Sequence, residues 1–437
     1  MVHQMMNTNS AKAPKASSKI NPMASASNAW CERLRQGAAA AILGLLAACS
    51  STPLPPATPP GPGSKPTAPS EPATPSGAHS AGSPERARLV LQRERSRWVA
   101  VDWSELPGWG EDRAAELWPA LLQGCARPAA GWAELCARAA LASPGDDHEV
   151  TLWLMQHLQA FRVESPEGET QGLLTGYFEP MLDATRKPLG GYQVPVHAAP
   201  PDLQQRRPYF SRQQLEGEQR QRLRGLELAY LDDPLDLLVL QIQGSGRLRV
   251  KSHPNDENGS WVRLAFAGHN DHPYQSIGKL LIERGELRPG EASWPAIRDW
   301  LRRNPQQARE VLWSNPRYVF FREEPLADPN IGPRGAQGVP LTPGRSVAVD
   351  RGSIPYGTAL WLEAGDPLQS GNSPLRRLVM AQDTGSAITG AVRADFFWGW
   401  GRDAEAQAGR MKQPLRLWAL WPRKSLGAGG QVLSTRP

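Results

Sequence analysis

The sequence predicts a mainly β protein with flanking helices, built from two parts, of which the C-terminal part forms a small β-barrel. A chain of 437 residues is long enough for two domains. Its charged fraction of 21% and hydrophobic fraction of 40% are typical of a soluble globular protein. Beyond Asn315 the chain is almost entirely short apolar segments broken by Gly and Pro, which favours strands. This change at about residue 315 predicts a domain boundary.

The segments before that boundary alternate between helical and strand-like patterns. The spacing of apolar residues predicts helical structure over 98–142 and a helix over 147–161. Residues 169–180 predict a strand that ends at Pro180. A hairpin is predicted from 247–250 and 261–266, because Asn258-Gly259 lies between two alternating segments. The remaining predictions are helices over 211–238, 276–284 and 296–312, and an apolar segment over 237–243 that runs into Gly244-Ser-Gly246.

The N-terminal 48 residues are predicted to be a signal peptide. Arg33 and Arg35 precede an apolar run over 38–48 that is too short to span a bilayer as a mature helix. The run stops at Leu-Ala-Ala-Cys49, which resembles a bacterial lipobox and implies cleavage before Cys49 and lipid attachment to it. The alternative is an ordinary signal peptide that contains a cysteine. Ser50 after the cysteine favours the outer membrane, so we expect a lipid-anchored protein on its periplasmic face.

Residues 49–85 form the predicted lipid anchor and a flexible tether. From 51 to about 84 the chain is rich in Pro, Ser, Thr, Ala and Gly and lacks apolar periodicity. Such a segment cannot bury enough apolar surface to offset the entropy of ordering it. A tether of this kind suits an enzyme that reaches away from its membrane.

Two cysteines remain beyond the anchor, Cys125 and Cys136. In an oxidising compartment a disulfide between them is expected, and two buried free thiols are the alternative. A metal site needs more ligands than these, and His269 and His272 lie in a polar loop without ligand spacing, so no metal and no cofactor is predicted. The net charge of +6 comes from scattered basic residues, so we expect no nucleic-acid partner.

Two aspartates near the C-terminus are the main candidates for chemistry. Asp383 and Asp395 stand twelve positions apart, each beside an apolar run and each followed by glycine. Asp383-Thr-Gly-Ser has the letters of an aspartic protease, which needs two carboxyl groups sharing one proton. Asp350, the nearest rival, lacks the motif, although a symmetric dimer keeps this alternative open. Gly-Ser245-Gly lacks the spacing of a serine hydrolase elbow.

Glycan cleavage asks for less, because one acid suffices when a hydroxyl of the sugar itself attacks. The acid protonates the departing glycosidic oxygen and later removes the proton of the attacking hydroxyl. Asp395 suits this role because aromatic side chains that follow it can desolvate its carboxyl group and raise its pKa. These are Phe396, Phe397, Trp398 and Trp400. The alternative is a surface aspartate in a turn beside aromatic residues of the core.

A series of short segments from about Leu173 to the C-terminus resembles the membrane-bound lytic murein transglycosylase A family. The segments, in order, are 174–180, 194–196, 241–247, 274–279, 281–285, 315–321, 338–344, 346–350, 354–358 and 383–401. Their number and order make the resemblance specific. The sequence departs from the family pattern at Ser386, where a second glycine is usual, and in one extra residue between the two aspartates.

The resemblance implies a double-psi β-barrel catalytic domain from 86–178 and 320–437, with a smaller β-rich, glycan-binding domain inserted at 179–319. Asp395 matches the family's catalytic acid and Asp383 a second aspartate of the site. The other positions that match substrate-binding motifs are Thr175, Gly176, Tyr177, Gln243, Gly244 and Ser245.

The implied reaction cleaves the β-1,4 bond between N-acetylmuramic acid and N-acetylglucosamine in peptidoglycan glycan strands. Attack by the muramyl C6 hydroxyl then gives a 1,6-anhydro end. Cell-wall synthesis or division proteins are candidate partners. Two alternatives stay open: a non-catalytic peptidoglycan-binding lipoprotein, and more remotely a protease using Asp383.

Overall fold

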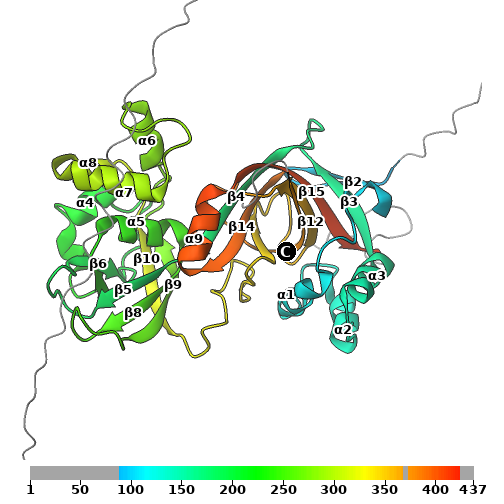
Figure 1. Ribbon diagram of the computed structural model, residues 1–437, viewed down its shortest axis with the longest axis horizontal. Coiled ribbons are helices and arrows are strands. Elements are labelled where there is room, and N and C mark those ends of the chain that lie inside the picture. The colour runs from blue at the N-terminus through cyan, green and yellow to red at the C-terminus, as the bar shows by residue number, and fades with distance from the viewer. Residues whose placement is uncertain (1–87, 368–372, 424–437) are drawn as a thin grey trace, which may run out of the picture. The chain divides into compact units, whose positions relative to one another are not determined.

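The computed structural model describes residues 88–367 and 373–423 (Figure 1). The predicted signal peptide over 1–48 and the predicted lipid anchor and tether over 49–85, which include Cys49, lie outside these residues. No helix in the described ranges combines the length and the apolar character needed to cross a membrane. The strands of the described residues form two sheets, one of nine strands and one of six, here named the barrel sheet and the second sheet.

The barrel sheet closes on itself. Its strand order is β1-β2-β3-β15-β12-β13-β11-β14-β4, and β4 pairs again with β15, which joins the last six strands of this order into a ring. The ring strands are β4 (Gly172–Glu179), β11 (Ser346–Val349), β12 (Ala359–Gly365), β13 (Pro374–Asp383), β14 (Arg393–Trp400) and β15 (Lys412–Pro422). Closure leaves these strands without a free edge. The prediction of a mainly β chain with a C-terminal barrel is therefore confirmed.

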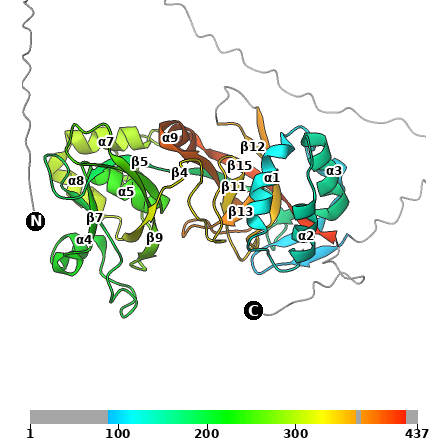
Figure 2. The ribbon, with the colours of Figure 1, turned by 90° about the horizontal axis from the view of Figure 1, so that it is seen from below.

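Three helices pack against the ring through one large apolar core. They are α1 (Trp118–Gly124), α2 (Ala133–Leu141) and α3 (Asp147–His157), and Figure 2 shows them together beside β11, β12 and β13. Cys125, directly after α1, and Cys136 in α2 form a disulfide, with Cα atoms 5.3 Å apart. The bond joins the two helices at neighbouring ends.

The same N-terminal segment contains strands that the helical prediction missed. The short strands β1 (Val90–Gln92), β2 (Arg97–Ala100) and β3 (Leu158–Glu164) extend the sheet beyond β15. Helix α3 ends at His157 rather than near Phe161, because Leu158–Pro422 and the following pairs continue the ladder with β15. Tertiary pairing here overrides a locally helical pattern.

The second sheet is open and has the order β10-β9-β8-β5-β7-β6. Its strands are β5 (Met181–Thr185), β6 (Val194–His197), β7 (Glu227–Leu231), β8 (Gly246–Lys251), β9 (Ser260–His269) and β10 (Val319–Pro325). The predicted hairpin is confirmed, since β8 and β9 pair antiparallel. The predicted helical stretch over 211–238 was wrong at β7, where Ala229 pairs with Val196 of β6. The proposed limits of an inserted domain at 179–319 remain a prediction.

The helices of this region are α4 (Arg212–Glu216), α5 (Pro234–Gln243), α6 (Ile277–Glu283), α7 (Trp294–Arg303) and α8 (Pro305–Trp313). The helix predicted over 296–312 is two helices, because Pro305 starts a new one at its first turn. A further helix, α9 (Gly401–Arg410), was not predicted. Its Ala404 and Ala408 side chains are buried in an apolar cluster that also contains side chains of α5 to α8.

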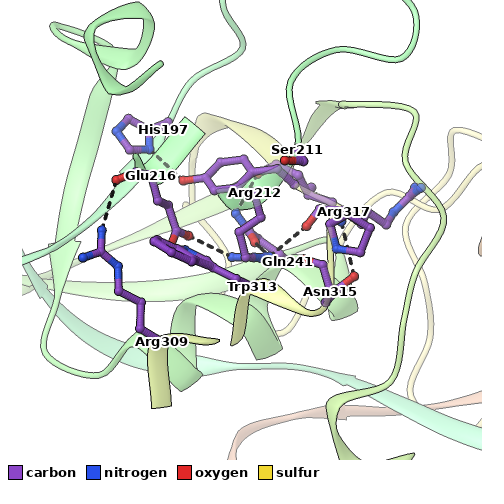
Figure 3. Close-up of polar contacts among 12 residues, drawn as sticks. His197, Ser211, Arg212, Glu216, Gln241, Arg309, Trp313, Asn315 and Arg317 are labelled. Atoms are coloured by element: carbon purple, nitrogen blue, oxygen red, sulfur yellow. Dashed lines mark hydrogen bonds and ion pairs between the residues drawn. The ribbon is translucent and has the colours of Figure 1, made fainter. Parts of the chain in front are cut away.

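A buried arginine organises the polar interior beside α4 and α5 (Figure 3). Arg212 donates to the backbone oxygens of Asn315 and Arg317 over 3.2 and 2.9 Å, and to the side-chain oxygen of Gln241. It also pairs with Glu216 over 3.2 Å. These contacts fix α4 and α5 to the chain that leads into β10. Gln241, which Arg212 contacts, lies in the last turn of α5.

Candidate active site

The pairing of strands aligns the two candidate aspartates across the barrel sheet. On β11, Ala348 pairs with Asp383 of β13 on one side and with Asp395 of β14 on the other. Asp395 in turn pairs with Thr175 of β4. Residues opposite each other in neighbouring strands project to the same face. Asp383, Asp395 and Thr175 therefore share one face, with the Cα atoms of the two aspartates about 10 Å apart.

Asp395 is held by a directed pair of hydrogen bonds. The Arg393 guanidinium donates to Thr175 Oγ over 2.8 Å, and the Thr175 hydroxyl donates to Asp395 Oδ1 over 2.5 Å. A hydroxyl has one hydrogen. Since the threonine oxygen receives a bond from Arg393, its own hydrogen is directed at Asp395. Oδ1 is thus an acceptor, and a proton bound to this carboxyl group is carried by Oδ2.

The surroundings of Asp395 raise its pKa to about 6. Burial of the carboxyl group is the main cause, and the negative charge of Asp383 adds to it. The Thr175 hydrogen bond and the positive charge of Arg393 act in the opposite direction. The residue keeps a partly accessible surface, so the carboxyl group can meet a ligand. A carboxyl group with this pKa exchanges a proton near neutral pH, as acid-base catalysis requires.

Asp383 has a different set of partners. The Tyr177 hydroxyl donates to its Oδ2 over 2.9 Å, and the backbone N–H of Ala336 donates to its Oδ1 over 2.9 Å. Burial raises the pKa of Asp383, while hydrogen bonds from Thr384, Ala336 and Tyr177 lower it. Burial also raises the pKa of Tyr177 well above its ordinary value, so its hydroxyl keeps its proton. Both oxygens of Asp383 are therefore committed as acceptors.

A small apolar cluster lies on the same face as the aspartates. It contains Tyr177, Leu341, Ala348, Ile388 and Phe397, with Trp400 packed against it. The Tyr177 and Phe397 rings are 5.2 Å apart between centres. Of the four aromatic residues expected beside Asp395, the structure places Phe396 in the large barrel core, and Trp398 packs against that core. Strand alternation explains this, because Phe396 follows Asp395 by one residue and Phe397 by two.

The other predicted substrate-binding residues divide into two groups. Gln243 at the end of α5 accepts a hydrogen bond from the backbone N–H of Phe178 on β4 over 3.0 Å, next to the site. Gly244 follows in the left-handed conformation with φ of 81°, and partly accessible Ser245 leads into β8. Gly176 lies on the opposite face of β4: an added Cβ would be 2.8 Å from the Trp398 indole nitrogen. Gly176 lets Trp398 and Ala408 pack closely against β4, and it does not share a face with Thr175 and Tyr177.

The two aspartates differ in where they lie on their strands. Asp383 does end its strand, β13, and a turn with Gly385 and Gly390 follows. Asp395, in contrast, lies inside β14, where it has strand partners on both sides. This difference fixes the Asp395 side chain more firmly than a position in a turn would.

Two contributors to the site were missed. Arg393 stands two residues before Asp395 on the same strand, so alternation alone places both on one face and was a usable signal. The backbone N–H of Ala336 comes from the long connection before β11, and nothing in the sequence pattern indicates it.

Within the described chain, Asp350, Asp383 and Asp395 do not form the paired carboxyl groups that the aspartic protease alternative needs. Asp350 accepts from Arg95 over 3.2 Å and from the backbone N–H groups of Gly352 and Gly390. Asp383 and Asp395 are each held by separate donors, and β11 runs between their strands. A shared proton of the protease type requires two carboxyl groups in direct contact. Among the described residues no cluster of His, Cys, Asp or Glu suits a metal ion.

Comparison with known proteins gives two matching family models. Residues 173–322 match the MltA specific insert domain, and residues 345–421 match the 3D domain. The chain is 33% identical over 285 residues to membrane-bound lytic murein transglycosylase A of Vibrio cholerae, which covers 61% of this chain and 73% of that protein.

Two solved structures are also similar. Lytic transglycosylase LtgG of Burkholderia pseudomallei is 41% identical, with a TM-score of 0.54 over 77% of this chain and 98% of that chain. Escherichia coli MltA with bound chitohexaose is 26% identical, with a TM-score of 0.59 over 77% of this chain and 95% of that chain.

The closed barrel, the aspartates on one of its faces and these relatives define the class as lytic transglycosylases, which are glycan-cleaving enzymes. Within that class the chain belongs to the membrane-bound lytic murein transglycosylase A family.

Proposed function

We propose that this lytic transglycosylase cleaves the β-1,4 bond between N-acetylmuramic acid and N-acetylglucosamine in peptidoglycan, with Asp395 as its single acid and base. One observation carries the proposal. Asp395 is partly buried and has a pKa of about 6 and one hydroxyl partner, whereas the neighbouring Asp383 has both oxygens engaged by donors. Only one of the two carboxyl groups is therefore suited to give and take a proton.

In the first step Asp395 donates the proton on Oδ2 to the glycosidic oxygen. The bond between this oxygen and the muramyl C1 breaks, its electron pair stays on the oxygen, and positive charge develops at C1. The N-acetylglucosamine part leaves with a free hydroxyl at C4. The hydrogen bond from Thr175 to Oδ1 stabilises the carboxylate that forms, since hydrogen bonds to a charged oxygen are the stronger ones.

In the second step the carboxylate of Asp395 removes the proton of the muramyl C6 hydroxyl. The C6 oxygen bonds to C1, which gives a 1,6-anhydro ring and returns Asp395 to its protonated form. No water enters, so no second carboxyl group is needed to activate it. Asp383, fixed by Tyr177 and Ala336, shapes the site and adds negative charge near the developing positive charge.

We propose glycan strands of peptidoglycan as the substrate and the periplasmic face of the outer membrane as the location. The Escherichia coli relative was solved with bound chitohexaose, which is an oligosaccharide. The curated relatives are named membrane-bound. Attachment of lipid to Cys49, with residues 49–85 as the tether, would supply the membrane contact without a spanning helix.

The deciding experiment is mass spectrometry of the products released from purified sacculi. The proposed reaction gives muramyl ends that are lighter by one water than hydrolysed ends. Ends that contain the water would overturn the proposal in favour of a lysozyme-like hydrolase. Binding of sacculi without any released product would favour the non-catalytic alternative.

A further inference from the structure

The chain passes between its two sheets at two places, and one buried carboxylate lies at the first. Strand β4 of the barrel sheet ends at Glu179, and after Pro180 the chain enters β5 of the second sheet. It returns from β10 through residues 326–345 to β11. We call 179–180 and 326–332 the outward and return crossovers. Glu179 has no exposed surface, so its charge requires partners.

Both partners of Glu179 are arginines of the second sheet. Arg247 of β8 donates its Nε to Glu179 Oε2 over 2.7 Å. Arg263 of β9 donates its Nε to Oε1 over 2.8 Å and its Nη2 to Oε2 over 3.4 Å. The arginine side chains are 2% and 8% exposed. The end of the barrel strand is thus fixed to two strands of the other sheet.

The remaining donors of the same arginines hold the return crossover. Arg247 donates to the backbone oxygens of Pro329 over 2.5 Å and Ile331 over 3.1 Å, and Arg263 also donates to Ile331. The Arg247 guanidinium carbon lies 3.7 Å from the centre of the Trp400 ring at the end of β14. We name the group of Glu179, Arg247 and Arg263 the crossover clamp.

Stability alone is a poor explanation for the crossover clamp. It buries two positive charges against one negative charge, and buried ion groups of this kind are often no more stable than apolar side chains of similar volume. The carbonyl oxygens and the face of the Trp400 ring offset the surplus positive charge. An apolar side chain in place of an arginine would not donate hydrogen bonds. A guanidinium group donates them in fixed directions within one plane, which orients the segments that it joins.

The clamp is directly connected to the candidate site. Arg247 follows Ser245 by two residues, and its backbone N–H donates to Pro180 O over 2.7 Å. Trp400, under its guanidinium group, follows Asp395 by five residues on the same strand. Glu179 is four residues from Thr175 on β4.

We propose that Arg247 is a positioning residue: through the crossover clamp it holds the Gln243–Ser245 loop in a fixed relation to Asp395. This inference rests on the proposed function for its link to turnover. Arg247 itself is buried and acts through the chain segments that it joins. A lysine cannot replace it, since one ammonium group cannot meet Glu179 and two carbonyl oxygens in these directions.

The test compares Arg247→Met with Arg249→Met. Arg249 is two residues further along β8, so it lies on the same face, and it is also paired with a carboxylate, Asp183, over 2.6 Å, but it is partly exposed and touches neither crossover. Hydrogen exchange of peptides covering 172–180 and 326–332 is measured alongside product release from sacculi. Arg247→Met should speed exchange in both peptides and lower turnover about 10- to 100-fold, while Arg249→Met leaves both within about twofold.

A triple variant separates positioning from stability. Glu179→Met, Arg247→Met and Arg263→Met together remove every charge of the clamp, so the melting temperature should return to near that of the wild type. Turnover should stay about 10-fold or more below wild type, with the pH dependence of kcat/KM unchanged because Asp395 keeps its partners. Return of full turnover together with stability would overturn the proposal.

Two further outcomes are distinguishable. If Arg247→Met does not fold, Arg247→Lys carries the same comparison, and it should also stay low in turnover. If wild-type protein releases hydrolysed ends, the proposed function fails while the exchange measurement still decides the clamp. Unchanged exchange in either crossover of the Arg247 variant would contradict the inference whatever the products are.

Discussion

Two carboxylates lie along strand β4: Glu179 at its end, and Asp395, which bonds to Thr175 in its middle. The two differ in the number and charge of their hydrogen-bond donors. Glu179 receives three hydrogen bonds from two guanidinium groups and has no exposed surface. Asp395, beside Thr175 of β4, receives one bond from a neutral hydroxyl, and its nearest cation, Arg393, bonds that hydroxyl. The comparison shows how partner number separates roles: a fully compensated carboxylate fixes the chain, and an under-compensated one can exchange a proton.

The largest effect is expected from Asp395→Asn. The amide keeps the shape and the bond from Thr175 but cannot donate or remove the proton, so product release should fall at least about 10³-fold. Released products from sacculi are quantified, and co-sedimentation of the variant with sacculi is the control for retained binding. Cleavage at the wild-type rate would show that the acid lies elsewhere.

The other carboxylate is tested by Glu179→Gln. Removing the only negative charge of the crossover clamp leaves two buried arginines without their carboxylate partner, so the free energy of unfolding should fall by about 3–5 kcal/mol. Denaturant unfolding measures it. The matched control is Asp183→Asn, whose partners Arg249 and Lys251 lie in a partly exposed ion pair, where about 1 kcal/mol or less is expected. Equal losses would remove the contrast between the two regions.

A third expectation concerns stability against pH. The pKa of Asp395 is raised in the folded protein from 3.8 to about 6, so the folded state holds this proton more tightly than the unfolded state. Wild type therefore loses stability relative to Asp395→Asn as pH rises from about 4 to 6, by up to about 3 kcal/mol. Melting at pH 3.5 and pH 8 measures it, with Asp299→Asn, at an exposed position of α7, as the control. A difference independent of pH would contradict the raised pKa.

The smallest effect is a shift in the pH profile of Thr175→Val. The Thr175 hydroxyl lowers the pKa of Asp395, so its removal should raise that pKa further. In wild type, kcat/KM should fall as pH rises through about 6, and in the variant this fall should move to higher pH. Thr175→Ser keeps the hydroxyl and should follow the wild-type profile. A shift to lower pH would mean that the hydroxyl does not stabilise the charged form.

Sequence patterns predicted the elements whose signal is local. The Asn258-Gly259 turn predicted the β8–β9 hairpin, and the short apolar segments beyond Asn315 predicted the barrel. Strand β7 and strand β3 were taken as helical, because Leu, Ala and Glu favour helices and the partners that make these segments strands lie far away in the chain.

The candidate site shows the same limit. The aspartates were found from their motifs and from the family resemblance. Their geometry was not, because it depends on the parallel pairing of β14 with β4 and on a bulge in the pairing of β11 with β13. Periodicity carries no information about which strands are neighbours. It does fix which residues share a face, and by that rule Arg393 could have been named and Phe396 set aside.

Closure of the barrel by β4 comes late in synthesis. Thr175 and Asp395 are 220 positions apart, and β4 finds its two ring partners, β14 and β15, only among the last segments of the chain. Everything between, including the second sheet, is made first, and contacts over such separations form slowly. A nascent or truncated chain that lacks β14 therefore contains Thr175 but not Asp395. Under the proposed function, glycan cleavage therefore requires the C-terminal strands to be in place.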